Sequence, residues 1–232
     1  MALNLTEFEN REAASQAAAA MMARALEADI ATSGAASLMV SGGSTPERVF
    51  RLLSARDMEW AKVTVGLVDE RWVAPDDPDS NERLVRTVLL QGRAAAARFI
   101  PMKTSQACPR DAEADRIAAY APYCKAPSFV LLGMGTDGHT ASWFSGSPGL
   151  AQTAAPDAAH CLAGVEASGA AVPQRMTLTG AGVLTAQRAL LLVFGEEKRS
   201  MLISAPHADP MACPVRFAID GLGERLSVYW AP

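Results

Sequence analysis

The stretch SFVLLGMGTDGHT, residues 128–140, decides the fold that we expect for this chain. Residues 128–132 form a short, largely apolar run without charge, which is typical of a strand buried on both faces of a sheet. The run stops at a glycine-rich loop that carries Asp137 and His139. Because ligands of open α/β sheets bind beyond the carboxyl ends of the strands, this order predicts a buried strand that leads directly into a binding site.

The same alternation of apolar runs and helical segments continues on both sides of this stretch. Strands are expected at 37–40, 63–68, 175–179, 189–194 and 227–230. Helices are expected at 12–30, 46–53, 81–90, 110–120 and 196–203, with a further short helix before the strand at 189–194. Apolar strands that alternate with helices predict an α/β fold with a mostly parallel sheet covered on both faces. Because no repeat or long polar linker divides the chain, we expect one domain over residues 1–232.

Composition excludes several classes of protein. Half of the 232 residues are hydrophobic and a fifth are charged, which is too apolar for a disordered chain. The net charge of −4, without a basic segment, argues against nucleic acid or an anionic membrane surface as a partner. No apolar run approaches the length of a membrane span. The four cysteines are few and include no CxxC pair, which predicts reduced thiols. The N-terminus is unlike a signal peptide, and together these features predict a cytoplasmic location.

A second glycine loop, SGGSTP at residues 41–46, also follows a predicted strand and precedes a helix. Gly42 and Gly43 allow backbone N–H groups to approach an anion, and the helix N-terminus adds partial positive charge. Ser44 and Thr45 add hydroxyl groups. The pattern fits a phosphate site, but it also fits an ordinary turn in which Thr45 caps the helix.

The loop at residues 133–138 formally contains the GxGxxG pattern of dinucleotide-binding proteins. That fingerprint needs an acidic residue at the end of the next strand, and here Asp157 lies in an Ala/Pro-rich stretch with no strand before it. We therefore expect no nicotinamide or flavin cofactor. The loop histidine, His139, has a side-chain type that can act as a general base near pH 7. His160 and His207 are interpreted as structural, and three histidines without i, i+4 spacing predict no metal site.

Charged residues also gather where predicted strands begin or end. The cluster Asp69-Glu70-Arg71 follows the strand at 63–68, and its place at the binding edge favours a functional role over a solvated ion pair. Lys198 opens a helix and Arg175 opens a strand, positions that spacing alone does not assign to a ligand. There is no GxSxG elbow. If the chain is a hydrolase, water is therefore its expected nucleophile.

Taken together, five segments resemble the 6-phosphogluconolactonases. In chain order they are SGGSTP (41–46), DERWVAPDDPDSN (69–81), LLGMGTDGHTASWF (131–144), VPQRMTLT (172–179) and LLVFGEEK (191–198). One glycine motif alone would be weak, but five in the same order are specific. The resemblance covers roughly residues 40–201, although the tracts 103–127 and 150–171 carry no recognisable motif and residues 214–232 fit only loosely.

The resemblance implies a Rossmann-like three-layer sandwich shared with glucosamine-6-phosphate deaminase and, more remotely, ribose-5-phosphate isomerase. It implies hydrolysis of 6-phosphoglucono-1,5-lactone to 6-phosphogluconate without a metal or an organic cofactor. By the same resemblance, His139 is the catalytic base, and Asp69, Arg71 and Asp137 surround the reacting end. The groups around the phosphate and sugar are Gly42, Gly43, Ser44, Thr45, Arg175 and Lys198. We expect a small sugar-phosphate lactone as the partner, and a monomer or a weak homodimer.

In the mechanism that we expect, neutral His139 takes a proton from a water molecule as this water attacks the C1 carbonyl. The oxyanion donor is Arg71 or an amide of a glycine loop, and the sequence does not choose between them. Either Asp137 or Asp69 orients the imidazole. Both alternatives stay open at this point.

Two other functions fit parts of the pattern. The deaminase resembles this chain at the GGSTP and DGH loops, but in that family an acidic residue five positions after the histidine serves ring opening, and here that residue is Phe144. A non-catalytic sugar-phosphate sensor would be expected to carry a DNA-binding segment with a basic face. The chain shows no such charge cluster, so the sequence favours the lactonase.

Overall fold

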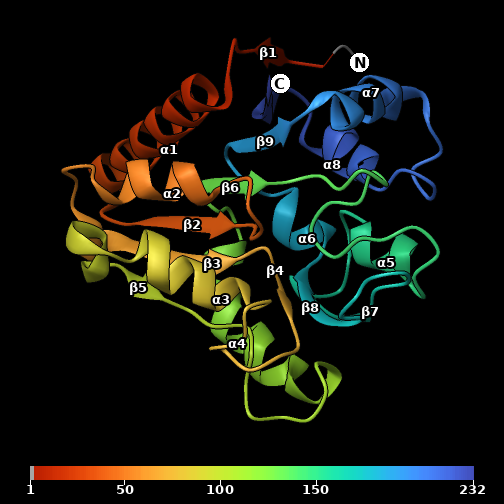
Figure 1. Cartoon of the computed structure of the whole chain (residues 1–232). Helices are drawn as coiled ribbons and strands as arrows, with labels where there is room; N and C mark the ends of the chain where they lie inside the picture. The colour runs from red at the N-terminus through yellow and green to blue at the C-terminus, as the bar shows by residue number, and fades with distance from the viewer. Residues whose placement is uncertain (1–2) are drawn as a thin grey trace.

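The computed structural model describes residues 3–232 and arranges their strands in two sheets (Figure 1). The larger sheet has the order β1-β10-β9-β6-β2-β3-β5, and every pair of neighbouring strands in it is parallel. Its strands are β1 (Leu5–Glu7), β2 (Ala36–Val40), β3 (Val63–Leu67), β5 (Arg98–Phe99), β6 (Phe129–Leu132), β9 (Ala189–Phe194) and β10 (Leu226–Ala231). The predicted parallel sheet is confirmed.

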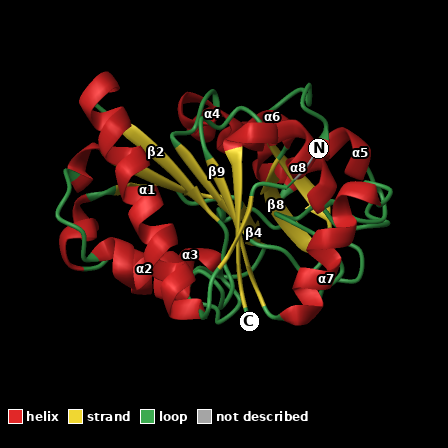
Figure 2. Ribbon diagram, turned by 90° about the horizontal axis from the view of Figure 1, so that it is seen from above, coloured by secondary structure: helices red, strands yellow, loops and turns green. Residues whose placement is uncertain are grey.

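Helices cover both faces of this sheet, so the molecule has the expected three layers (Figures 1 and 2). On one face lie α1 (Arg11–Ser33), α2 (Glu47–Ser54) and α3 (Asn81–Leu84), which continues as a π-helical turn (Val85–Leu89). On the other face lie α4 (Glu113–Cys124), α6 (Gly180–Val183) and α8 (Val215–Leu222). The remaining helices are α5 (Leu150–Ala154) and α7 (Glu196–Ser204), with 3₁₀ turns at Trp60–Lys62, Gly92–Ala96, Arg110–Ala112, Ala205–His207 and Gly223–Arg225.

The second sheet is small and antiparallel, and the sequence did not predict it. It has the order β4-β8-β7, with β4 (Asp69–Arg71), β8 (Gln174–Leu178) and β7 (Leu162–Glu166). The charged segment expected as the end of a strand is thus itself a strand, in which Arg71 pairs with Arg175. Three consecutive charged residues have low strand propensity, so only their pairing with β8 makes this segment extended.

Most expected helices and strands occur within a few residues of their predicted ends. The Ala-rich helix α1 begins after Asn10, whose side chain accepts a hydrogen bond from the N–H of Ala13 (2.8 Å), and ends at the left-handed Gly34. By contrast, β1, β5 and β7 were not predicted, because short runs rich in small or polar residues give no clear period of two.

The core packs the α1 face against the main sheet, and β2 is buried along its whole length. Tyr120 of α4 connects the helical layer to the sheet: its hydroxyl donates to the carbonyl of Ile100 (2.9 Å) and accepts from the N–H of Leu67 (3.0 Å).

The four cysteines form no disulfide with one another. Over residues 3–232, no helix is both long enough and apolar enough to cross a membrane.

Candidate functional site

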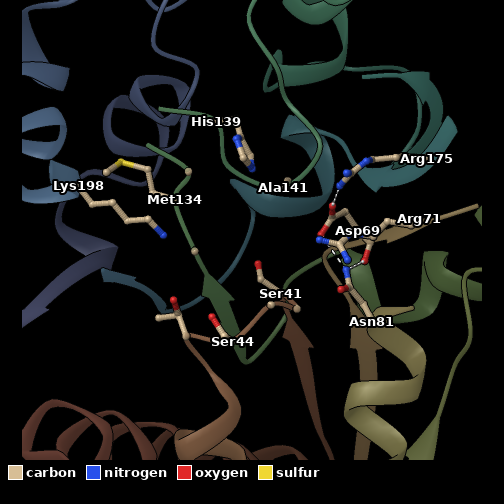
Figure 3. Close-up of a pocket in the computed structure, with 15 residues that line it drawn as sticks. Ser41, Ser44, Asp69, Arg71, Asn81, Met134, His139, Ala141, Arg175 and Lys198 are labelled. Carbon is tan, nitrogen blue, oxygen red and sulfur yellow. Dashed lines mark hydrogen bonds and ion pairs between the residues drawn. The ribbon is translucent and has the colours of Figure 1, made fainter. Parts of the chain in front are cut away.

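A cavity of about 230 Å³ lies where the carboxyl ends of β2 and β6 meet the small sheet (Figure 3). Its size is below the roughly 300–1,000 Å³ of sites for drug-sized ligands, which suits a small metabolite. Every residue predicted for the site lines this cavity except Asp137: they are Gly42, Gly43, Ser44, Thr45, Asp69, Arg71, His139, Arg175 and Lys198. Residues that the sequence did not assign also line it: Ser41, Asn81, Gly133, Met134, Gly135 and Ala141. The exposed His160 and His207 lie elsewhere.

The SGGSTP loop connects β2 to α2 and forms one wall of the cavity. Gly43 has a φ of +88°, which a residue with a side chain adopts only with strain. A Cβ on Gly42 would overlap the side chain of Asn81. The predicted cap at Thr45 is wrong, because α2 starts after Pro46 and no side chain caps it. The hydroxyls of Ser44 and Thr45 instead line the cavity beside an uncapped helix N-terminus, an arrangement suited to an anion.

His139 and Asp137 form a pair in the loop after β6. The imidazole Nδ1 lies 2.6 Å from Oδ1 of Asp137, which also accepts a hydrogen bond from the backbone N–H of His139. The hydrogen bond with His139 lowers the pKa of Asp137. A Cβ on Gly135 would overlap both side chains, so a glycine is required at this position. With Nδ1 engaged, Nε2 is the ring nitrogen that remains for a ligand.

Of the two aspartates considered for orienting the imidazole, Asp69 occupies a different network. Its buried carboxylate accepts a hydrogen bond from the hydroxyl of Ser142 (2.6 Å) and pairs with Arg175 at 3.4 Å. Asn81 donates from its amide to the Asp69 carbonyl (2.8 Å). Burial lowers the pKa of Arg175 and the charge of Asp69 opposes this shift. Asp137 therefore holds the histidine, while Asp69 holds Arg175.

Glu70 organises the region around Arg71, although the sequence placed it only within the charged cluster and assigned it no individual role. Its carboxylate accepts hydrogen bonds from the backbone N–H groups of Arg71, Asn81 and Glu82 and from the Ser80 hydroxyl, at 2.7–3.0 Å. Burial raises the pKa of Glu70 to about 7, although these hydrogen bonds oppose the shift. Glu70 thus joins β4 to the start of α3 and fixes both Arg71 and Asn81 at the cavity.

Two buried donors at the cavity have no partner in the protein. Over the part of the chain that the structure describes, buried side-chain polar atoms without a hydrogen bond are Ser41 Oγ, Arg71 Nε and Glu82 Oε2. Ser41 and Arg71 both line the cavity. An unpaired buried donor costs about 1–3 kcal/mol, so we expect ligand oxygens or water to meet these two atoms. Ser41 opens the SGGSTP motif, but nothing in the sequence indicated that its hydroxyl would be unpaired.

Positive side chains face the cavity from two sides. Lys198, at the start of α7, lies with Ser44 on one side, and Arg71 and Arg175 lie on the other (Figure 3). Burial lowers the pKa of Lys198. The sequence placed Arg175 and Lys198 together around the phosphate and sugar. In the structure they lie on different sides of the cavity, and Arg175 lies beside Asp69. In residues 3–232, no three His, Cys, Asp or Glu side chains gather in a way that would hold a metal ion.

The fold and the site define the class: this is a Rossmann-like α/β protein with one cavity lined both by His139, which is paired with Asp137, and by the SGGSTP loop. Residues 9–229 match the family described as Glucosamine-6-phosphate isomerases/6-phosphogluconolactonase. Because the match spans nearly the whole chain, the chain belongs to this family.

Individual relatives agree with this assignment. The chain is 40% identical to the 6-phosphogluconolactonase of Rhizobium meliloti (strain 1021), over 100% of both chains. The crystal structure of a 6-phosphogluconolactonase from Shewanella baltica OS155 has a TM-score of 0.94 and 33% identity, and covers 100% of this chain and 98% of that one. A monomeric glucosamine-6-phosphate deaminase, at 18% identity and a TM-score of 0.77 over 98% of this chain and 96% of its own, shares the fold. The predicted fold class is thereby confirmed.

Proposed function

We propose that this chain hydrolyses 6-phosphoglucono-1,5-lactone to 6-phosphogluconate. The observation that carries the proposal is the His139–Asp137 pair, which leaves Nε2 available beside a small cavity with cationic groups on two sides. Membership of the family, and the name 6-phosphogluconolactonase carried by relatives that match over the full length, support the same activity.

In the proposed mechanism, the His139 imidazole accepts a proton from a water molecule while the water oxygen bonds to C1 of the lactone. General base catalysis of this kind contributes roughly 100- to 10,000-fold. The Asp137 carboxylate stabilises the imidazolium that forms, because it already bonds to Nδ1. The C1–O5 bond then breaks, and the imidazolium returns its proton to the departing ring oxygen. Water is consumed and a carboxylic acid is formed.

The remaining groups position the substrate. We assign the phosphate to the Ser44–Thr45 turn and Lys198, where an uncapped helix N-terminus and an ammonium group coincide. Arg71 and Arg175 then face the lactone end, and the unpaired Nε of Arg71 supports this residue over a loop amide as the donor to the developing oxyanion. Removing one such donor costs roughly 3 kcal/mol of transition-state stabilisation. The phosphate contacts, being distant from C1, supply orientation.

The test is a lactonase assay with freshly generated substrate, corrected for spontaneous hydrolysis. We expect His139→Ala to lower kcat/KM at least 100-fold while 6-phosphogluconate still binds, since the base contributes to the reaction and little to phosphate binding. His160→Ala, in which an exposed histidine outside the cavity is removed, is the matched control and is expected to keep full activity. Undiminished turnover by His139→Ala would refute the assignment of the base.

Glucosamine 6-phosphate is the informative second substrate, because the family description also names glucosamine-6-phosphate isomerases and a glucosamine-6-phosphate deaminase shares the fold. Ring opening by a deaminase requires a group that moves protons, and the phenyl ring of Phe144 has none. We therefore expect no release of ammonia above background. Ammonia release at a rate comparable to lactone hydrolysis would reverse the assignment in favour of the deaminase.

A further inference from the structure

The loop after His139 folds back on itself and returns Phe144 to the histidine. Thr140 and Trp143 form an isolated antiparallel bridge, and Ala141 between them has a φ of +51°, an uncommon value for a residue other than glycine. The indole of Trp143 donates to the carbonyl of Leu178 (2.9 Å), which anchors the turn to β8. A tight, anchored reversal therefore fixes where the next side chain lies.

Phe144 contacts two side chains of the site. Its ring is stacked on the imidazole of His139, with centroids 3.9 Å apart and planes inclined by 19°. The guanidinium carbon of Arg175 lies 5.2 Å from the centroid of the same ring. Arg175 is itself held by Asp69 and by the carbonyl of Val172 (2.8 Å). Only 6% of Phe144 is exposed, so the contact with the cation is largely desolvated.

The contact with Asp137 alone does not fix the plane of the imidazole. The χ2 torsion of histidine has a broad energy profile, and one hydrogen bond at Nδ1 fixes one atom of the ring. The side chain of His139 is 29% exposed and that of Asp137 is 54% exposed, so neither is confined by close packing on all sides. The Phe144 ring provides a flat surface that resists rotation of the imidazole out of its plane.

We propose that Phe144 is a positioning residue that holds the His139 ring in the plane in which Nε2 faces the cavity. This inference rests on the proposed function of His139 as a base. Phe144 transfers no proton. Its ring increases the fraction of time that the imidazole spends in the orientation from which Nε2 can accept a proton. Because proton transfer is sensitive to small displacements of the base, losing the stack lowers kcat more than it changes KM.

The test compares Phe144→Leu, which keeps an apolar side chain but removes the ring, with Phe144→Tyr, which keeps the ring. We expect Phe144→Leu to lower kcat roughly 10-fold with KM within about twofold, and Phe144→Tyr to rescue most of kcat. Phe99→Leu is the matched control, since the Phe99 ring also contacts an arginine, Arg86, but is not stacked on His139. We expect it to leave kcat within about twofold of the wild type.

An NMR measurement of the His139 ring tests the stack without an activity assay, and it compares the wild type with two variants, so that it does not depend on the folding of one variant alone. In the wild type, the Cε1–Hε1 signal of His139 should be shifted upfield by the Phe144 ring current, and the shift should persist in Phe144→Tyr and vanish in Phe144→Leu. Absence of the shift in the wild type, or wild-type kcat in a folded Phe144→Leu variant, overturns the inference. Full activity of His139→Ala would instead overturn the proposed function, so the two failures are distinguishable.

Discussion

Lys198 is a residue whose role separates binding from chemistry. It reaches the cavity from the first turn of α7, on the side of Ser44 and away from Arg71 and Arg175 (Figure 3). If it contacts the phosphate, it interacts equally with the ground state and the transition state, because the phosphate is unchanged during hydrolysis. Such uniform binding lowers KM without raising kcat.

We therefore expect Lys198→Ala to raise KM for the lactone roughly 10- to 100-fold, which corresponds to the loss of one charge-assisted hydrogen bond, with kcat within about threefold. The control is Lys62→Ala, since Lys62 is a surface residue paired with Glu59. Steady-state kinetics of both variants give the answer. A fall in kcat at unchanged KM would place Lys198 at the reacting end.

Residues within the glycine motifs could be predicted, but their partners could not. Motif position indicated His139, Ser44 and Thr45 as residues of one site, and all three line the same cavity. Nothing in the sequence showed that the hydroxyl of Ser142 would bond to Asp69, 73 positions away. Contacts over such separations depend on how sheets and loops pack, which local patterns do not encode.

Among the elements, the junction of β4 and α3 depends on Glu70. Burial raises the pKa of Glu70 to about 7 in the folded protein, from an ordinary value of 4.5. Between these two values the folded state binds more protons than the unfolded state, so the contribution of Glu70 to stability is present at low pH and is lost as the pH rises through 7. A difference of this size corresponds to roughly 3 kcal/mol.

Glu70→Gln has no titrating group at position 70. Relative to this variant, we expect the free energy of unfolding of the wild type to fall by up to about 3 kcal/mol between pH 4.5 and 8. Urea denaturation at several pH values measures this difference. Glu27→Gln, a change at an exposed position of α1, should keep the wild-type pH dependence. Parallel pH profiles of the wild type and Glu70→Gln would contradict the prediction.

Elements with a strong local pattern were predicted, and those without one were missed. The Ala-rich α1 and the apolar strands β2, β6 and β9 have composition and length that match their secondary structure. The charged β4 has no such pattern, because its extended form comes from pairing with β8. For the same reason the sequence did not predict that the site would be shared between two sheets.

For the whole molecule, we propose that both sheets unfold as one domain. Buried residues of the small sheet, such as Met176 and Leu178, belong to the same hydrophobic cluster as the strands of the main sheet. The chain also passes directly from β3 into β4, with Val68 N–H donating to the carbonyl of Val40 and Leu178 N–H donating to that of Val68. A shared core and shared hydrogen bonds leave no boundary along which the two sheets could separate.

We therefore expect a single cooperative transition on thermal or urea unfolding. Far-UV circular dichroism and the fluorescence of the four tryptophans should give coincident curves, because Trp143 is bonded to Leu178 of the small sheet, Trp230 lies in β10 of the main sheet, and the dichroism reports on all elements. Adding 6-phosphogluconate should move both curves together, since a ligand of the folded state stabilises the whole cooperative unit. Two separated transitions would show that the sheets are independent domains.

The sequence by itself determined the α/β class, the mostly parallel sheet and the two glycine loops at strand ends, because these follow from composition and spacing within short segments. The family was indicated by the resemblance of five motifs in the same order. Only the tertiary structure decided that Asp137 rather than Asp69 holds His139, that Asp69 pairs with Arg175, and that the Phe144 ring contacts both the imidazole and the guanidinium. The physical reason is that secondary structure depends on neighbours a few residues apart, whereas these contacts form only when a second sheet packs against the first and brings its side chains to the same edge.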